Sequence, residues 1–192
     1  QKIAKIYAEN GAAALSVLTE DKFFLGKPEY IRELSSTFDI PILTKDFILD
    51  EGQIYEAAAN GAAAILLIVR ILDDATLKHL MTAAKDLKMD ALVEVHDKKE
   101  LDRALKAGAD IIGVNNRNLD TFAVDMKTSE ELIPLIIKAG KIAVAESGIK
   151  THQDVQRMKS LGAHAALIGE TFMTAPDIGK KIQEVITGQK RT

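Results

Sequence analysis

The sequence predicts an α/β fold in which parallel strands alternate with helices. Short aliphatic and β-branched runs recur along the chain, and each is entered from a turn signal and left through polar residues. The first residues of successive runs lie 28, 22, 28, 19, 31 and 23 positions apart, which fits one strand, one helix and two loops. Apolar strands joined by helices indicate a parallel sheet whose outer face the helices cover.

Seven runs are predicted as strands, because each is short, apolar throughout and bounded by turn residues. Their lengths fit buried strands rather than helices, which need about 10 or more residues. The predicted strands are 13–18, 41–44, 63–69, 91–95, 110–114, 141–145 and 164–168.

Helices are predicted between these strands, where apolar residues recur with helical spacing. Four of the segments end at a glycine that can adopt the left-handed cap conformation, namely Gly61, Gly108, Gly140 and Gly162. The predicted helices are 2–10, 51–60, 75–87, 98–106, 129–138, 153–161 and 177–186.

Two parallel architectures fit this order, an open doubly wound sheet and a closed (βα)8 barrel. The open sheet normally carries a glycine-rich nucleotide loop after its first strand, and residues 18–21 contain no glycine. Polar residues instead follow nearly every strand, and a barrel gathers such strand ends at one mouth. We therefore expect residues 1–192 to form a single TIM-barrel domain. A barrel needs eight strands and seven are found, so the first strand is expected to be absent at the N-terminus.

Composition excludes several classes of function. The 25 basic and 28 acidic side chains give a net charge of -3, so no basic field is available to gather nucleic acid. Cysteine is absent, which excludes disulfides, thiolate nucleophiles and cysteine-ligated zinc. The longest apolar stretch, 62–69, is too short to cross a membrane. These observations predict a cytoplasmic protein with no nucleic-acid or membrane partner.

Charged side chains at the strand ends suggest acid/base chemistry. Side chains alternate along a strand, so Glu94 should point to the barrel mouth, as should Lys45 on a second strand and Asn115 and Arg117 on a third. A buried lysine beside a carboxylate can exchange protons near neutral pH. The same pair can equally be a structural ion pair that fills the top of the barrel.

Glycine-containing segments follow the last two strands, where barrel enzymes frequently bind phosphate. Gly148 and Gly169 would let backbone N–H groups approach an anion, and Ser147 would add a hydroxyl donor. The alternative is that both glycines only form tight turns. The carboxylate of Glu170 is expected to turn away from a bound phosphate. No metal site is predicted, because the four histidines lack ligand spacing.

Several motifs together resemble the indole-3-glycerol phosphate synthase family, in the same order along essentially the whole chain. Lys45-Asp46-Phe47 and Asn115-Asn116-Arg117 distinguish this resemblance from sister barrels such as phosphoribosylanthranilate isomerase. The matching segments are 16–20 with Phe24 and Gly26, 41–48, 53–57, 92–96, 112–119 with Thr121 and Phe122, 145–149 and 167–170.

The resemblance implies a carbon-carbon lyase, a decarboxylase of tryptophan biosynthesis. Its small phosphorylated substrate would be 1-(2-carboxyphenylamino)-1-deoxyribulose 5-phosphate, which closes to indole-3-glycerol phosphate with release of carbon dioxide and water. No cofactor or metal is expected, and other tryptophan-pathway enzymes are candidate partners. The family's helical N-terminal extension and first strand, which carry a catalytic Glu and Lys, have no counterpart in this sequence. The alternative is therefore a catalytically silent phosphate-binding fragment.

The resemblance also implies roles for individual residues. Lys45 would be the general acid toward the ribulose carbonyl oxygen, Glu94 would transfer protons during dehydration, and Asn115 would hold substrate hydroxyls. The implied binding residues are Arg117 near the anthranilate carboxylate, Phe24 and Phe47 beside its ring, Glu146 as a further polar contact, and Ser147, Gly148, Gly169 and the Glu170 backbone at the phosphate.

Overall fold

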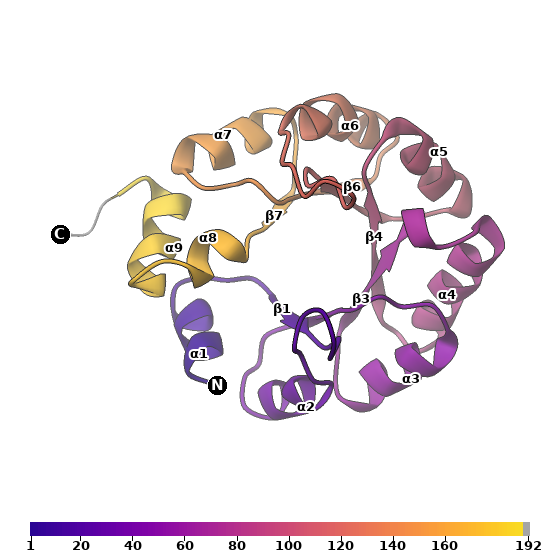
Figure 1. Cartoon of the computed structure of the whole chain (residues 1–192), viewed down its shortest axis with the longest axis horizontal. Helices are drawn as coiled ribbons and strands as arrows, with labels where there is room; N and C mark the ends of the chain where they lie inside the picture. The colour runs from indigo at the N-terminus through magenta and orange to yellow at the C-terminus, as the bar shows by residue number, and fades with distance from the viewer. Residues whose placement is uncertain (190–192) are drawn as a thin grey trace. The chain divides into compact units, whose positions relative to one another are not determined.

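The computed structural model describes residues 1–189, and within them it has the predicted alternation of strands and helices (Figure 1). Every predicted strand and helix is present, with ends within two residues of those predicted. In chain order the elements are α1 (Lys2–Glu9), β1 (Leu15–Leu18), α2 (Glu29–Ser35), β2 (Ile42–Lys45), α3 (Glu51–Ala59), β3 (Ala64–Ile68), η1 (Val69–Ile71), α4 (Asp74–Asp86), β4 (Asp90–Val95), α5 (Lys98–Ala107), β5 (Ile111–Asn115), α6 (Lys127–Lys138), β6 (Ile142–Glu146), α7 (His152–Ser160), β7 (Ala165–Leu167), α8 (Glu170–Met173) and α9 (Ile178–Thr187).

The chain divides into two compact units. The first comprises 1–94 and 103–109, and the second comprises 95–102 and the described residues from 110 onward. Strands β1 to β4 pair in parallel in chain order within the first unit. Strands β5, β6 and β7 do the same within the second. The prediction of an α/β fold with parallel strands is confirmed in each unit.

In the first unit, strand β3 is buried on both faces. Ile65, Leu66 and Leu67 are consecutive residues of β3, so their side chains alternate between faces, and none is more than 1% exposed. Helix α2 packs on β2 and α4 packs on β3, and α2, α3 and α4 follow one another along one side of the strands (Figure 1). This double burial explains why the predicted strand 63–69 is apolar throughout rather than alternating.

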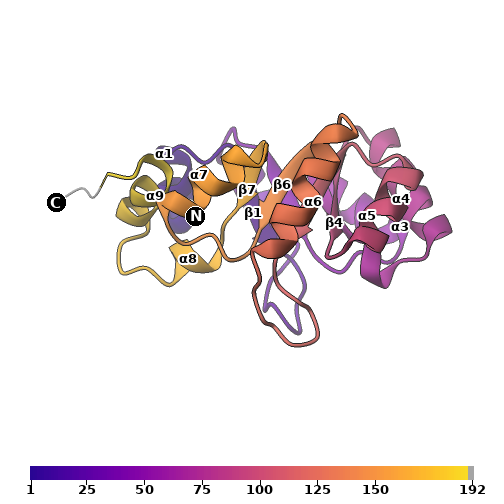
Figure 2. The same cartoon turned by 90° about the horizontal axis from the view of Figure 1, so that it is seen from above.

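In the second unit, α6 covers β5 and β6, and Figure 2 shows it lying over β6. Ile133 and Ile136 of α6 are fully buried, as are Ile112 of β5 and Ala143 of β6. Helix α9 packs against α7 and α8. No helix in residues 1–189 is long and apolar enough to cross a membrane.

Local signals set many of the element ends. The four predicted cap glycines all have positive φ, between 70° and 96°.

Three elements lacked a prediction, namely α2, η1 and α8. They contain 7, 3 and 4 residues, which is two turns of helix or fewer, so apolar residues cannot repeat often enough to show a helical period.

Candidate active site

Lys45 and Glu94 form an ion pair in the first unit, where sequence reasoning expected a proton-exchanging pair. Lys45 is the last residue of β2, and Glu94 is the last residue but one of β4. The Nζ atom of Lys45 lies 3.8 Å from Oε2 of Glu94, and their side chains are 23% and 1% exposed. A carboxylate buried this deeply needs a nearby cation to offset its lost hydration. Lys45 is therefore partly exposed to solvent, whereas Glu94 is buried.

Three phenylalanine rings lie in the loops that follow β1 and β2, and Phe47 comes two residues after Lys45 in the sequence. The rings of Phe24 and Phe47 stack with centroids 5.3 Å apart and planes 20° apart. Phe23 meets Phe47 edge-on, with centroids 6.3 Å apart. The Phe24 side of this stack is partly exposed, so it can offer an apolar surface to an aromatic substrate.

Two acidic residues, Asp46 and Glu20, hold these loops by accepting hydrogen bonds. The sequence suggested that Asp46 either orients Lys45 or caps its loop, and it suggested no role for Glu20. Asp46 accepts a hydrogen bond from the Thr19 hydroxyl at 2.5 Å and from the Phe47 N–H at 2.7 Å. Glu20 accepts hydrogen bonds from the N–H groups of Lys22, Phe23 and Phe24 at 2.9, 2.6 and 2.9 Å. The signal in the sequence is an acidic residue one or two positions after a strand end.

The pKa of Glu20 is lowered by this arrangement. Burial alone would raise the pKa, but the N–H donors of Phe24, Lys22 and Phe23 and the nearby Lys22 charge outweigh it. The loop then returns to the sheet at Gly26, where a Cβ atom would lie 2.2 Å from the Leu18 carbonyl oxygen. Only glycine fits that close approach.

Asn115 and Arg117 lie at the end of β5 in the second unit. The Asn115 Oδ1 atom accepts a hydrogen bond from the Arg117 N–H at 3.0 Å. Strand β5 ends at Asn115, so Arg117 lies beyond the strand and forms an antiparallel bridge with Val124. Asn115 therefore helps to shape the turn that carries Arg117.

The Arg117 guanidinium already holds a carboxylate. Its Nη2 atom lies 2.5 Å from Oε2 of Glu170, and its Nη1 donates to the Phe122 carbonyl at 3.3 Å. Sequence reasoning expected the Glu170 side chain to turn away from a bound phosphate, and its carboxylate is directed to Arg117. The guanidinium is therefore paired with Glu170 in this structure, and its predicted contact with a substrate carboxylate stays a prediction.

Ser147 and Gly148 form a tight turn directly after β6. Both have positive φ, 64° for Ser147 and 81° for Gly148. A Cβ atom on Gly148 would lie 2.6 Å from Cγ1 of Val124 and 2.8 Å from Sδ of Met126. Glycine is therefore required at 148. Glu146, the last residue of β6, is buried at the start of this turn.

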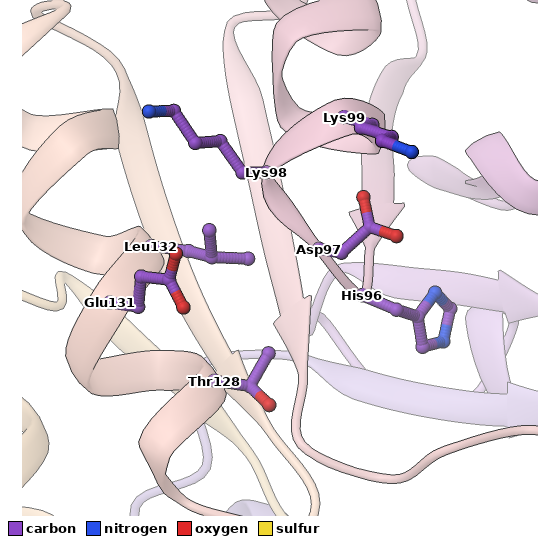
Figure 3. A pocket seen from close by; sticks show the side chains of 7 residues that line it. All are labelled: His96, Asp97, Lys98, Lys99, Thr128, Glu131 and Leu132. Atoms are coloured by element: carbon purple, nitrogen blue, oxygen red, sulfur yellow. The ribbon is translucent and has the colours of Figure 1, made fainter.

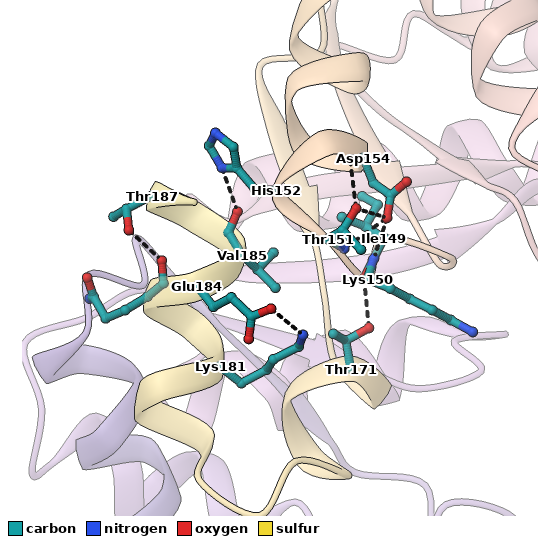
Figure 4. Close-up of polar contacts among 11 residues, drawn as sticks. Ile149, Lys150, Thr151, His152, Asp154, Thr171, Lys181, Glu184, Val185 and Thr187 are labelled. Atoms are coloured by element: carbon teal, nitrogen blue, oxygen red, sulfur yellow. Dashed lines mark hydrogen bonds and ion pairs between the residues drawn. The ribbon is translucent and has the colours of Figure 1, made fainter. Parts of the chain in front are cut away.

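Gly169 precedes the short helix α8. The register pairs Glu146 with Leu167, so the ends of β6 and β7 lie side by side. The Thr171 hydroxyl donates to the Ile149 carbonyl at 2.7 Å and ties α8 to the turn after β6 (Figure 4). A Cβ atom on Gly169 would meet no atom within 4 Å, so packing alone does not demand glycine there.

A separate cavity of about 360 Å³ lies in the second unit and contains none of the predicted site residues. The side chains of His96 and Lys99 point away from α6 in Figure 3. The residues that line this cavity are His96, Asp97, Lys98, Lys99, Thr128, Glu131 and Leu132. Within residues 1–189, no group of three or more His, Asp or Glu residues is arranged to hold a metal ion.

A profile of the indole-3-glycerol phosphate synthase family matches residues 1–185. This chain belongs to that family. The indole-3-glycerol phosphate synthase of Carboxydothermus hydrogenoformans is 46% identical over 186 residues, which cover 97% of this chain and 70% of that protein. The enzyme of the same name from Acetivibrio thermocellus is 51% identical over 183 residues, covering 95% and 70%. That of Legionella pneumophila is 47% identical over 186 residues, covering 97% and 72%.

Solved structures share the fold of this indole-3-glycerol phosphate synthase family member at low sequence identity. A 3-hexulose-6-phosphate synthase matches with a TM-score of 0.78 and 16% identity, over 96% of this chain and 90% of that one. KGPDC from Streptococcus mutans matches with a TM-score of 0.71 and 17% identity, over 96% and 89%. Sequence identities this low show a shared fold and nothing further about function.

Proposed function

We propose that the chain catalyses indole-3-glycerol phosphate synthesis, the carboxy-lyase reaction of its family in tryptophan biosynthesis. The observation that carries the proposal is the Lys45 and Glu94 ion pair, 3.8 Å between Nζ and Oε2, in a chain that belongs to this family. The substrate is a small phosphorylated molecule, 1-(2-carboxyphenylamino)-1-deoxyribulose 5-phosphate. The alternative of a catalytically silent phosphate-binding fragment is not favoured, because the family match includes both members of the pair.

Lys45 is the proposed general acid for ring closure. As the ring carbon that bears the carboxylate attacks the ribulose carbonyl carbon, a carbon–carbon bond forms and Lys45 gives its proton to the carbonyl oxygen. The carboxylate then leaves as carbon dioxide, and its bonding electrons restore the aromatic ring. A positioned acid of this kind contributes about 10²- to 10⁴-fold to the rate.

Glu94 is the proposed proton-transfer group for the dehydration that follows. The new hydroxyl leaves as water when it receives a proton, and a neighbouring carbon gives up a proton to form the indole double bond. A buried carboxylate beside the Lys45 ammonium can exchange protons with it during these steps and stabilise a cationic intermediate. Asn115 is proposed to hold the substrate hydroxyls.

The remaining predicted residues are proposed to bind the two ends of the substrate. Holding both ends of a flexible molecule lowers the entropic cost of bringing the reacting carbons together. Arg117 is proposed for the anthranilate carboxylate, Phe24 and Phe47 for its ring, and Glu146 for a further polar contact, while Ser147, Gly148, Gly169 and the backbone of Glu170 are proposed for the phosphate.

We also propose that the strands are those of a (βα)8 barrel and that residues 1–192 form one domain. Parallel pairing in chain order within each unit supports this proposal. The fold shared with 3-hexulose-6-phosphate synthase, at a TM-score of 0.78, supports it as well.

Replacement of Lys45 tests the proposed reaction. Lys45→Ala should lower kcat by at least about 100-fold, because the positioned acid is lost. Turnover is measured by the fluorescence of indole-3-glycerol phosphate, and inorganic phosphate should bind the variant as it binds the unmodified chain. Lys85→Ala on the exposed face of α4 is the matched control and should keep full activity. A Lys45→Ala chain with turnover near that of the control would contradict the general-acid role.

A further inference from the structure

Asn116 is a buried amide whose side chain is almost fully used in hydrogen bonds. It is 2% exposed and lies between Asn115 and Arg117, just after β5. Its Nδ2 atom donates to the carbonyl oxygens of Glu146 at 3.0 Å and Ser147 at 3.1 Å. Its Oδ1 atom accepts from the N–H of Ser129 at 3.0 Å. One side chain therefore joins three segments of the second unit.

The Oδ1 atom of this amide caps the N-terminus of α6. Ser129 is the third residue of that helix, and the first N–H groups of a helix have no partner within it. The Asn116 Oδ1 atom supplies that partner from outside the helix. The amide is thus fixed in orientation by α6, and its Nδ2 group is directed to the turn after β6.

The donor side fixes two successive peptide planes of that turn. In a trans peptide the C=O and the N–H of the next residue point in opposite directions. The Glu146 carbonyl accepts from both the Asn116 N–H, at 2.9 Å, and Nδ2, and the Ser147 carbonyl accepts from Nδ2. With both carbonyls drawn toward Asn116, the N–H groups of Ser147 and Gly148 are directed away from it. Successive N–H groups on one side of a turn form a concave site for an anion.

The same contacts support an unfavourable backbone conformation. Ser147 has a φ of 64°, which non-glycine residues adopt rarely and only where their surroundings enforce it. The Ser147 carbonyl bonded to Nδ2 and the packing of Val124 and Met126 against Gly148 provide that enforcement.

We propose that Asn116 is the positioning residue of the phosphate site, because its amide holds the Glu146 and Ser147 carbonyls back and presents the Ser147 and Gly148 N–H groups to the phosphate. This inference rests on the proposed function, since that function places the substrate phosphate at this turn. Asn116 itself contacts no substrate. It acts through the backbone of the turn.

The test compares Asn116→Ala with the unmodified chain and with Ser129→Ala as a matched control. Ser129→Ala removes a buried hydroxyl from the same cluster and keeps the N–H that bonds to Asn116. Isothermal titration with inorganic phosphate gives Kd, and the fluorescence assay gives KM and kcat. Asn116→Ala should raise Kd for phosphate and KM for the substrate by about tenfold, with kcat changed less than about threefold. Ser129→Ala should leave all three constants unchanged.

A purely structural role would give a different result. It would lower the fraction of folded protein, and with it the apparent kcat, while Kd and KM stayed the same. Asn116→Ala with an unchanged Kd for phosphate would overturn the proposal, as would an unmodified chain that does not bind phosphate. Phosphate binding without turnover in the unmodified chain would contradict the proposed function and leave the role of Asn116 standing.

A second variant and a second measurement keep the test decisive if Asn116→Ala fails to fold. Asn116→Asp keeps an acceptor for the Ser129 N–H and loses the Nδ2 donor, so it should retain α6 and weaken phosphate binding. In the unmodified chain, the NMR signals of the Asn116 side-chain NH₂ should be protected from solvent exchange and should shift on phosphate titration. Signals that do not move would overturn the proposal.

Discussion

Glu20 organises its loop with a single carboxylate, which makes the loop sensitive to pH. Because three N–H donors lower its pKa below the ordinary 4.5, the carboxylate stabilises the loop fully above that ordinary value. The stabilisation is lost as the pH falls through the lowered pKa. Phe23 and Phe24 depend on it directly, since both N–H groups bond to Glu20.

Glu20→Gln should therefore remove, at neutral pH, the stabilisation of the loop that acid removes from the unmodified chain. Hydrogen exchange measured by NMR should show protection factors for the Phe23 and Phe24 N–H groups that are high near neutral pH, fall in acid, and are low at every pH in Glu20→Gln. Asp21→Asn is the matched control, because the Asp21 carboxylate accepts neither bond. Unchanged protection in Glu20→Gln would show that the loop holds itself without this carboxylate.

Helix α7 begins with a capping box that can be tested by one substitution. Thr151 accepts from the Asp154 N–H at 3.2 Å, and Asp154 Oδ2 accepts from the Thr151 N–H at 2.9 Å (Figure 4). Thr151→Ala should lower the free energy of unfolding by about 1 kcal/mol, and Thr151→Ser should preserve it. Urea denaturation followed by circular dichroism measures both. Equal losses in the two variants would mean that the hydroxyl does not cap the helix.

The capping box also shows which elements sequence patterns can predict. Helix ends follow from residues that act within a few positions, such as Thr151 on Asp154 or Gly162 after α7. Strands such as 65–67 follow from burial on both faces, which leaves only apolar residues. Helix α8 was not predicted, because a helix of 4 residues depends on its surroundings and has no pattern of its own.

The candidate site could be predicted in its residue types and only partly in its contacts. The Lys45 and Glu94 pairing follows from the alternation of side chains along strands. The Arg117 and Glu170 pair joins residues 53 positions apart, and nothing local to either indicates the other. Asn116 likewise depends on partners in two other segments. Such contacts arise only when the chain folds.

At the scale of the whole molecule, an anionic substrate must bind a chain whose net charge is -3. Net charge acts over long distances and is screened beyond about 8 Å at physiological salt. We therefore expect binding to be decided locally, by the groups proposed above, which are the Arg117 guanidinium and the backbone N–H groups at the Ser147 and Gly148 turn. These N–H donors carry no net charge, so the overall composition does not reveal them.

Phosphate binding should then be visible in the stability of the whole chain. A ligand that binds only the folded state stabilises it by RT ln(1 + [L]/Kd), which is about 2.7 kcal/mol at 100 times Kd. Potassium phosphate should raise Tm more than potassium chloride does at equal ionic strength, as measured by differential scanning calorimetry. Equal effects of the two salts would mean that no phosphate site exists.

Two glycine variants separate the phosphate site from general stability. Gly148→Ala and Gly140→Ala both force alanine into positive φ, 81° and 70°, so both should lower Tm. A Cβ at 140 meets no atom within 4 Å, whereas one at 148 collides with Val124 and Met126. Phosphate should still raise Tm in Gly140→Ala, while Gly148→Ala, whose turn is displaced, should lose most of that rise. A phosphate-specific rise in Tm that Gly140→Ala keeps and Gly148→Ala loses would locate the anion at this turn, because the strain common to both variants cancels in the comparison.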